Sequence, residues 1–70
     1  MEDNRDLMIR RKRLGLRLED VGEQFGVSAV TLSAFERGRN RSMYAGGDRA
    51  KRIGRAEYEA LLEQLEAERD

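Results

Sequence analysis

The segment that follows residue 36 carries the side chains best suited to bind an anion. It reads Arg37-Gly38-Arg39-Asn40-Arg41, so three guanidinium groups recur at every second position. A guanidinium can donate two parallel hydrogen bonds to phosphate oxygens, and glycine lets a backbone come close to a ligand. We therefore predict that this segment binds nucleic-acid phosphates, which are contacts that position a protein without reading sequence.

Other reactive chemistry is poorly represented. The sequence contains no His and no Cys, so it lacks the usual general base, the usual nitrogen ligand for metals and any thiolate site. It has no glycine-rich phosphate motif with its lysine, and Glu59, Glu63 and Glu66 are spaced like the solvated face of an amphipathic helix. We therefore expect no catalytic residues, no metal site and no cofactor.

Charge is segregated along a chain whose formal net charge is zero. Residues 37–55, the basic segment, hold seven basic groups and one acidic group, whereas residues 56–70, the acidic segment, hold six acidic groups and one basic group. Such asymmetry points to nucleic-acid contact. A further hypothesis is that the acidic segment lies near the basic segment of its own or a partner chain, where it competes with DNA or orients a dimer.

Two short helices across a tight turn are predicted just before the basic segment. Apolar residues stand at positions that can face inward together: Val21, Phe25, Val27, Leu32 and Phe35. Gly26 can end the first helix in a left-handed conformation, and Ser28 is a strong N-cap for the second. Gly22 lies inside the first helix, where glycine costs about 1 kcal/mol relative to alanine. We expect a close approach of the second helix to explain it, and a helix-turn-helix to result.

This passage resembles the phage-repressor and Cro-like family of helix-turn-helix DNA-binding proteins, often called the XRE type. The resemblance covers about residues 5–41. The residues that carry it are Gly22, Gly26 and the run Glu36-Arg37-Gly38-Arg39. Within the family, an arginine of the first helix pairs with the glutamate that ends the recognition helix. The resemblance therefore implies a structural ion pair between Arg11 and Glu36.

The resemblance also implies how the protein meets DNA. The second helix of the motif lies in the major groove with its N-terminal residues at base edges, while the first crosses the backbone. The implied base-reading residues are Ser28, Ala29, Val30, Thr31, Ser33 and Ala34, and the implied phosphate-binding residues are Arg17, Arg37, Arg39, Asn40 and Arg41. Family members commonly use Gln, Arg, Asn or Ser for bidentate base contacts. Because Ala29, Val30 and Ala34 can contact only thymine methyl groups, we expect specificity to depend on DNA shape, methyl contacts and flanking arginines.

A second departure from the family pattern lies at the start of the first motif helix. Leu18 occupies the position where the family often has a glutamine that hydrogen-bonds a phosphate, so that contact is lost. Arg17 stands in place of the usual Ser or Thr cap. Its charge, together with the amides at the helix N-terminus, could replace the missing phosphate contact.

Helices are also predicted on both sides of the motif. The first runs from an N-cap at Asp3 or Asn4 to about Arg13, and a short helix runs from an N-cap at Asp48 to Ile53. A last helix covers about residues 56–68. Its apolar stripe consists of Tyr58, Leu61, Leu62 and Leu65. Because a stripe of under two heptads cannot make a coiled coil by itself, it packs in the core, on a partner copy, or on both.

These elements predict an all-α fold, a compact four- to five-helix domain with a central helix-turn-helix. We expect one domain over residues 1–70, with the motif at about 17–37, a basic loop at 37–55 and the acidic helix at about 56–68. A chain of 70 residues buries only about 60% of its unfolded surface, so dimerisation would add useful core.

The expected function is that of a sequence-specific double-stranded DNA-binding transcriptional regulator, a repressor of the phage-repressor or Cro type. We expect a homodimer on two half-sites about one helical turn apart. The alternative is a protein-binding module, an antitoxin-like or anti-repressor-like adaptor that uses its Ala29-Val30-Ala34 face. The acidic N-terminus and the lack of an apolar run of ~18 residues predict a cytoplasmic, nucleoid-associated protein without a membrane partner. No small-molecule ligand is evident.

Overall fold

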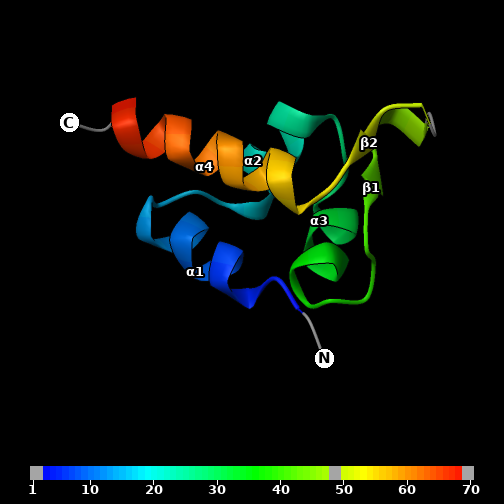
Figure 1. The fold of residues 1–70 in the computed structure, drawn as a ribbon, viewed down its shortest axis with the longest axis horizontal. Helices are drawn as coiled ribbons and strands as arrows, with labels where there is room; N and C mark the ends of the chain where they lie inside the picture. Colours follow the sequence, from blue (N-terminus) through cyan, green and yellow to red (C-terminus); the bar gives the residue numbers. More distant parts are fainter. Residues whose placement is uncertain (1–2, 48–49, 69–70) are drawn as a thin grey trace.

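Four α-helices and one small hairpin make up the described part of the computed structural model, residues 3–47 and 50–68 (Figure 1). The helices are α1 (Arg5–Arg13), α2 (Leu18–Phe25), α3 (Ala29–Glu36) and α4 (Arg55–Glu68). Between α3 and α4 come strand β1 (Met43–Tyr44), the 3-10 turn η1 (Ala45–Gly47) and strand β2 (Arg52–Ile53). The predicted all-α fold with a helix-turn-helix at its centre is confirmed.

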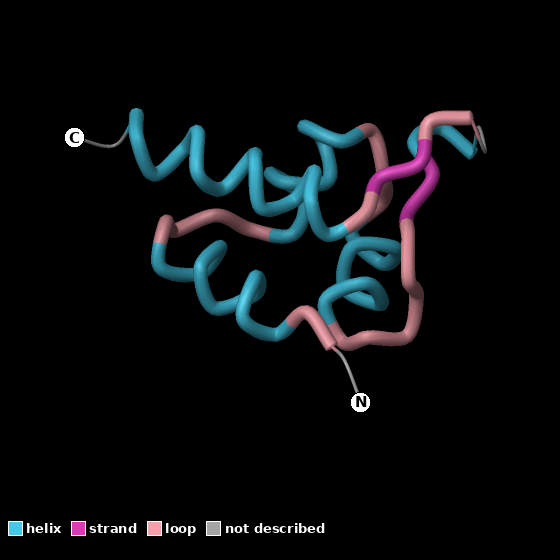
Figure 2. The backbone as a smooth tube through the Cα atoms, viewed as in Figure 1, coloured by secondary structure: helices cyan, strands magenta, loops and turns pink. Residues whose placement is uncertain are grey.

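The short helix predicted for residues 48–53 is wrong. Residues 52 and 53 instead form β2, which pairs antiparallel with β1 (Figure 2). The expected cap of that helix, Asp48, lies outside the described residues. Within the turn, Gly46 has a φ of 60° and its N–H donates to the carbonyl of Gly26 at 3.0 Å. This bond ties the hairpin to the turn between α2 and α3.

Alternating burial explains why the hairpin forms instead of a helix. The register pairs Met43 with Ile53 and Tyr44 with Arg52. The first pair is buried, with exposed fractions of 1% and 8%, whereas the second pair is exposed. A period of two places both apolar side chains on the same face of a strand pair. The hairpin therefore closes the core on the side of α3.

The core draws a side chain from each helix and from both strands. Its buried apolar residues are Leu7, Val21, Leu32, Phe35, Met43, Ile53, Tyr58 and Leu62. The Tyr58 ring lies 5.8 Å from the ring of Phe25 and 6.1 Å from that of Phe35, between centroids. Along the stripe of α4, Tyr58 and Leu62 are fully buried in this core. Leu61 and Leu65 are half-buried, and Leu61 also packs against this core.

Local backbone chemistry forms the turn between α2 and α3. Gly26 has a φ of 75°, in the left-handed region where glycine is favoured. The N–H of Val27 donates to the carbonyl of Gly22 at 2.9 Å, and the N–H of Gly26 donates to that of Glu23 at 3.3 Å. The hydroxyl of Ser28 then accepts from the N–H of Thr31 at 3.2 Å, which confirms the predicted N-cap of α3.

The close approach at Gly22 has a different source from the one predicted. A Cβ added at Gly22 would lie 2.6 Å from the carbonyl oxygen of Val27, and the nearest atom of Ser28 would lie at 3.8 Å. The neighbour is therefore the turn itself and not the body of α3. The Schellman-type bond from Val27 back to Gly22 pulls this carbonyl over the end of α2.

Asn4 joins the start of α1 to the end of α3. It occupies the N-cap position of α1, but its side chain makes no capping bond, and Asp3 instead accepts from the N–H of Arg5 at 3.2 Å. The side-chain amide of Asn4 donates to the carbonyl of Phe35 at 2.9 Å. The backbone N–H of Asn4 donates to the carbonyl of Glu36 at 3.2 Å. Two carbonyls at the C-terminal end of α3 are thereby satisfied.

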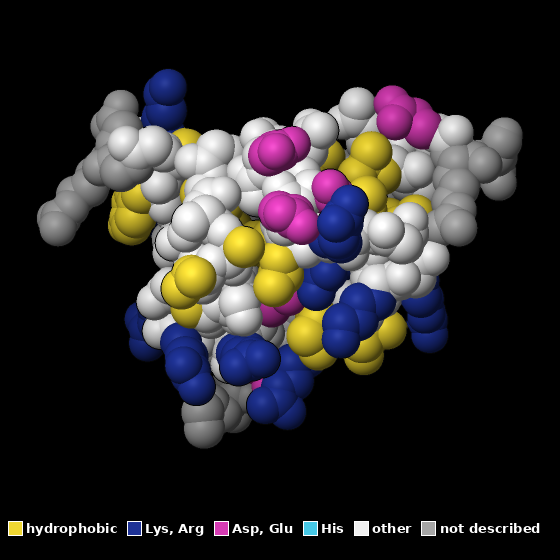
Figure 3. Space-filling model, turned by 180° about the vertical axis from the view of Figure 1, so that it is seen from behind, with side chains coloured by type: hydrophobic (Ala, Val, Ile, Leu, Met, Phe, Trp, Pro, Cys, Tyr) yellow, Lys and Arg dark blue, Asp and Glu magenta, His cyan; other side chains and the backbone are white. Residues whose placement is uncertain are grey.

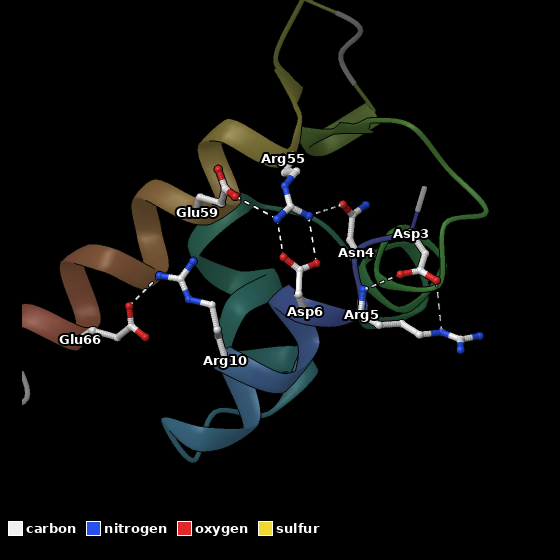
Figure 4. Close-up of polar contacts among 8 residues, drawn as sticks. All are labelled: Asp3, Asn4, Arg5, Asp6, Arg10, Arg55, Glu59 and Glu66. Carbon is white, nitrogen blue, oxygen red and sulfur yellow. Dashed lines mark hydrogen bonds and ion pairs between the residues drawn. The ribbon is translucent and has the colours of Figure 1, made fainter. Parts of the chain in front are cut away.

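Ion pairs link α4 to α1, which lies alongside it (Figures 1 and 4). Arg55 contacts both carboxylate oxygens of Asp6 and lies 3.0 Å from the carboxylate of Glu59. Further along, the guanidinium of Arg10 lies 2.7 Å from the carboxylate of Glu66. Glu66 of the acidic segment is therefore directed to α1, and not to the arginines that follow α3.

The pair between Asp6 and Arg55 predicts an acid-sensitive component of stability. The hydrogen bond and charge of Arg55 lower the pKa of Asp6 below its ordinary value of 3.8. A lowered folded-state pKa stabilises the fold above the unfolded pKa, and this stabilisation is lost as the pH falls through the folded pKa. Urea unfolding of the wild type should show stability decreasing below about pH 3.8. Asp6→Asn should be less stable at neutral pH and lose less of its unfolding free energy in acid. Identical acid profiles would contradict the pair.

Candidate nucleic-acid interface

The outward face of α3 forms one wall of an open hollow. Val30 is 80% exposed at the start of this face. The hollow has a volume of about 410 Å³, and its lining residues are Leu18, Ala29, Val30, Ser33, Ala34, Arg37 and Arg39. We call it the α3 hollow. It has an apolar floor, one hydroxyl and a rim with two guanidinium groups.

Four of the six predicted base-reading residues line the α3 hollow: Ala29, Val30, Ser33 and Ala34. The other two, Ser28 and Thr31, lie outside it and hydrogen-bond each other. The hydroxyl of Ser28 donates to that of Thr31 at 2.9 Å while accepting from its N–H. The oxygen of Ser28 is therefore engaged in starting the helix, which leaves Ser33 as the polar side chain within the α3 hollow.

Leu18 is a lining residue that the sequence did not predict. It stands at the start of α2 and supplies apolar surface beside Ala29 and Val30. The sequence showed only that a phosphate-binding glutamine of the family is missing at this position. The sequence did contain a signal for this role, because Leu18, the first residue of α2, is apolar like the residues predicted for the outward face of α3. The structure brings these features together in one surface.

Two of the predicted phosphate-binding residues, Arg37 and Arg39, border the α3 hollow. Both are exposed, and among residues 3–47 and 50–68 no carboxylate pairs with either guanidinium. Asn40 and Arg41 follow in the same loop and are also exposed, but they do not line the α3 hollow. The three arginines are available to an anionic partner from outside the chain, and the amide of Asn40 is exposed beside them.

Arg17 has a different environment from the other predicted phosphate-binding residues. Its guanidinium lies 3.4 Å from the carboxylate of Glu19 and 3.8 Å from that of Asp20. The backbone N–H of Arg17 donates to the carboxylate of Asp20 at 2.8 Å, while the side chain of Arg17 makes no capping hydrogen bond. These two carboxylates offset the charge of Arg17 and weaken the case that it replaces the lost phosphate contact.

A buried ion pair holds α3 in place behind this surface. The Nε of Arg11 lies 2.8 Å from one carboxylate oxygen of Glu36, and a terminal nitrogen lies 3.2 Å from the other. The remaining nitrogen of Arg11 donates to the carbonyl of Leu16 at 2.8 Å, and the hydroxyl of Tyr58 donates to Glu36. The pair implied by the family resemblance is thus present, with Tyr58 as a third member that the sequence did not reveal.

The electrostatics of this cluster follow from its burial. The side chains of Arg11 and Glu36 are 6% and 2% exposed. Burial alone would lower the pKa of Arg11, but the hydrogen bond and charge of Glu36 raise it above its ordinary value. Burial and the nearby carboxylate raise the pKa of Tyr58. The Arg11 guanidinium therefore stays charged and the Tyr58 hydroxyl stays protonated at neutral pH, and the hydrogen-bonded cluster joins α1, α3 and α4.

Charge is unevenly distributed over the surface as well as along the sequence. Figure 3 shows most of the Lys and Arg side chains of one face along its lower edge, and most of the Asp and Glu side chains over its upper and central parts, among apolar side chains. A net charge of zero is compatible with a basic surface at one end of the molecule.

The fold and this surface define a class: a small helical protein built around a helix-turn-helix with a basic edge. The helix-turn-helix domain family matches residues 5–70, and the chain belongs to that family. This membership is consistent with the resemblance to the phage-repressor and Cro-like type. It points to a DNA-binding regulator from a family that is typically non-enzymatic.

Other comparisons add no relatives. Neither the curated proteins nor the solved structures gave a match. Within the described ranges, no helix combines the length and apolar character needed to cross a bilayer.

Proposed function

We propose that the protein is a sequence-specific regulator that binds double-stranded DNA and represses transcription by occupying a promoter. The observation that carries the proposal is the outward face of α3. It is bordered by Arg37 and Arg39, which have no carboxylate partner among the described residues, and it is fixed from behind by the pair between Arg11 and Glu36. This combination suits a helix held rigidly for insertion into a groove between two phosphate backbones. A protein with this role would be found with the nucleoid in the cytoplasm.

Base reading in this proposal depends on shape and methyl groups. The α3 hollow offers Ala29, Val30 and Ala34 to thymine methyls, and Ser33 to a hydrogen-bonding base edge. Arg37 and Arg39 contact phosphates next to the groove, with Asn40 and Arg41 beyond them. Because few direct hydrogen bonds are available, sequence-dependent groove shape supplies part of the specificity.

We also propose that the protein binds as a homodimer. A pair of helix-turn-helix units related by a two-fold axis reads two half-sites about one helical turn apart. Leu61 and Leu65 are half-buried on α4 and are the proposed contact between the two copies. Sedimentation of the free protein would test this directly, since a monomer at all concentrations would remove the dimer from the proposal.

The experiment that tests the function is DNA binding across a salt series, combined with selection from a random duplex pool. DNA binding releases counterions, so the logarithm of the binding constant falls linearly with the logarithm of the salt concentration. The slope of this line, the salt slope, has a magnitude of about 0.9 per phosphate contact. A steep slope and a recovered palindrome would support a dimeric, sequence-specific regulator. Absence of binding at low salt would overturn the proposed function.

The double variant Arg39→Ala with Arg41→Ala should weaken binding to all duplexes alike. Loss of two phosphate contacts should reduce the salt slope by about two units without altering the selected sequence. Arg10→Ala serves as the control, because it removes a positive charge from the side of α1 that faces α4. If the double variant matched the control in affinity and slope, the loop would be excluded from the interface.

A second function is favoured by the apolar floor of the α3 hollow. Leu18, Ala29, Val30 and Ala34 together could receive an apolar side chain of a protein partner, as in an antitoxin-like or anti-repressor-like adaptor. An apolar interface changes little with salt, whereas phosphate contacts weaken steeply. The salt series described above therefore also separates these two functions.

A further inference from the structure

A second hollow lies beside the first, between α1 and the residues that follow α3. It has a volume of about 520 Å³, and its lining residues are Arg5, Met8, Lys12, Arg37 and Arg39. We call it the α1 hollow. Residues 5, 8 and 12 stand at the spacing of one helix face, so α1 presents a stripe with a cation at each end and a thioether between them.

The cations of the α1 hollow are available for binding. Lys12, Arg37 and Arg39 have no carboxylate partner among the described residues. Arg5 is 66% exposed, and its nearest carboxylate oxygen, on Asp3, lies 3.6 Å from its Nε. Four positive groups thus line one hollow. The contact of Arg5 with Asp3 is drawn in Figure 4.

The opposite side of α1 shows the contrast. There, Arg10 is paired with Glu66 at 2.7 Å, and Arg55 contacts Asp6 and Glu59. Carboxylates therefore pair with the cations between α1 and α4, whereas on the side of the α1 hollow only Arg5 has a carboxylate, that of Asp3, among the described residues. Cations that gain no intramolecular partner raise the local potential and attract an anion.

The two hollows form one continuous surface, because Arg37 and Arg39 border both of them. We propose that the α1 hollow binds a phosphate of the DNA backbone that flanks the groove entered by α3. This inference rests on the proposed function. Arg5 and Lys12 of α1 donate to the phosphate oxygens from one side, and Arg37 and Arg39 donate from the other. The DNA interface thus extends beyond the helix-turn-helix to the first helix of the chain.

A backbone phosphate suits this hollow better than a base edge does. All four cationic groups are donors without an acceptor, so together they match the oxygens of a phosphate, which only accept, better than a base edge that presents both donors and acceptors. The duplex carries a phosphate backbone on each side of the major groove, so a protein surface that extends laterally from the recognition helix meets one of them. The α1 hollow occupies such a lateral position, with the shared arginines between it and α3.

The test compares full-length Lys12→Gln with Arg5→Gln, as single and double variants, against the wild type. Binding to mixed-sequence duplex is measured across a salt series. We expect each single variant to reduce the salt slope by about 0.9 units, and the double variant to reduce it by about twice that amount. The matched control is Arg10→Gln, which removes the same charge from the same helix on its other side and should keep the wild-type slope. Because Arg5 and Lys12 are exposed, the Arg5→Gln and Lys12→Gln variants should unfold at the wild-type temperature.

The outcomes separate this inference from the proposed function. If the wild type binds duplex and the double variant keeps its slope, the α1 hollow is not a phosphate site and the proposal is overturned while DNA binding stands. If the wild type binds no duplex, both fail. Titration with inorganic phosphate at constant ionic strength addresses a free anion. Saturable phosphate binding that the double variant abolishes, with an unchanged duplex slope, would assign the hollow to free phosphate and overturn the proposal.

Discussion

Glu36→Ala is expected to lower the unfolding free energy by about 3 to 5 kcal/mol, because it leaves the Arg11 guanidinium buried without its carboxylate. The same substitution removes the acceptor of the Tyr58 hydroxyl, so three donor groups on two buried side chains lose their partner. No buried side-chain nitrogen or oxygen lacks a hydrogen-bond partner in residues 3–47 and 50–68 of the wild type. The variant therefore creates a defect in a region that is otherwise fully satisfied.

The size of this loss is decisive for so small a protein. The free energy of unfolding of a domain is roughly 0.05 to 0.15 kcal/mol per residue. For a chain of 70 residues, the loss expected from this defect is therefore a large part of the whole unfolding free energy. Urea unfolding followed by circular dichroism at neutral pH measures the effect. If Glu36→Ala were as stable as the wild type, the pair would make no net contribution to the free energy of folding.

Two control variants locate the origin of the effect. Tyr58→Phe removes one donor to Glu36 and keeps the ring packed between Phe25 and Phe35, so it should cost about 1 kcal/mol. Glu19→Ala removes an exposed carboxylate near Arg17 and should change stability by less than about 1 kcal/mol. A Glu19→Ala loss as large as that of Glu36→Ala would mean that total charge, and not the buried pair, governs stability.

Features set by local chemistry could be predicted from the sequence. Gly26 and Ser28 act through bonds to residues within four positions, so their types alone indicated a left-handed helix end and an N-cap. The pairing of Arg11 with Glu36 spans 25 positions and was available only through the family resemblance. The exposed arginines after α3 were predicted from their type and spacing, and the structure adds that Arg37 and Arg39 lack a carboxylate partner among the described residues.

Features set by distant contacts could not be predicted. The two strands have only two residues each, too few to show alternation, and Met43 meets Ile53 only when both pack on the core. Asn4 has the residue type of a helix N-cap, yet its amide donates to Phe35, 31 positions away. The α1 hollow likewise depends on where α1 packs relative to the end of α3. In each case the tertiary contact determines the role of a residue whose type fits several roles.

Gly22→Ala is expected to destabilise the protein although alanine is the better helix former. The helix propensity of α2 would gain about 1 kcal/mol. Against this, the new Cβ would lie 2.6 Å from the carbonyl oxygen of Val27, a backbone atom that cannot rotate away. Overpacking of this kind costs up to about 3 kcal/mol, which gives an expected net loss of about 2 kcal/mol. Gln24→Ala, at an exposed position of the same helix, is the control and should change stability by less than about 0.5 kcal/mol.

The same variant separates the position of α3 from its charge. Val27 directly precedes Ser28, the N-cap of α3, so relief of the clash shifts the start of the recognition helix. Gly22→Ala should therefore bind its selected duplex more weakly while keeping the salt slope, because every phosphate-binding arginine is retained. A reduced slope would mean that the turn also positions the arginines after α3. Unchanged affinity together with unchanged stability would show that the turn accommodates a methyl group. The close approach of the Val27 carbonyl would then not explain why residue 22 is glycine.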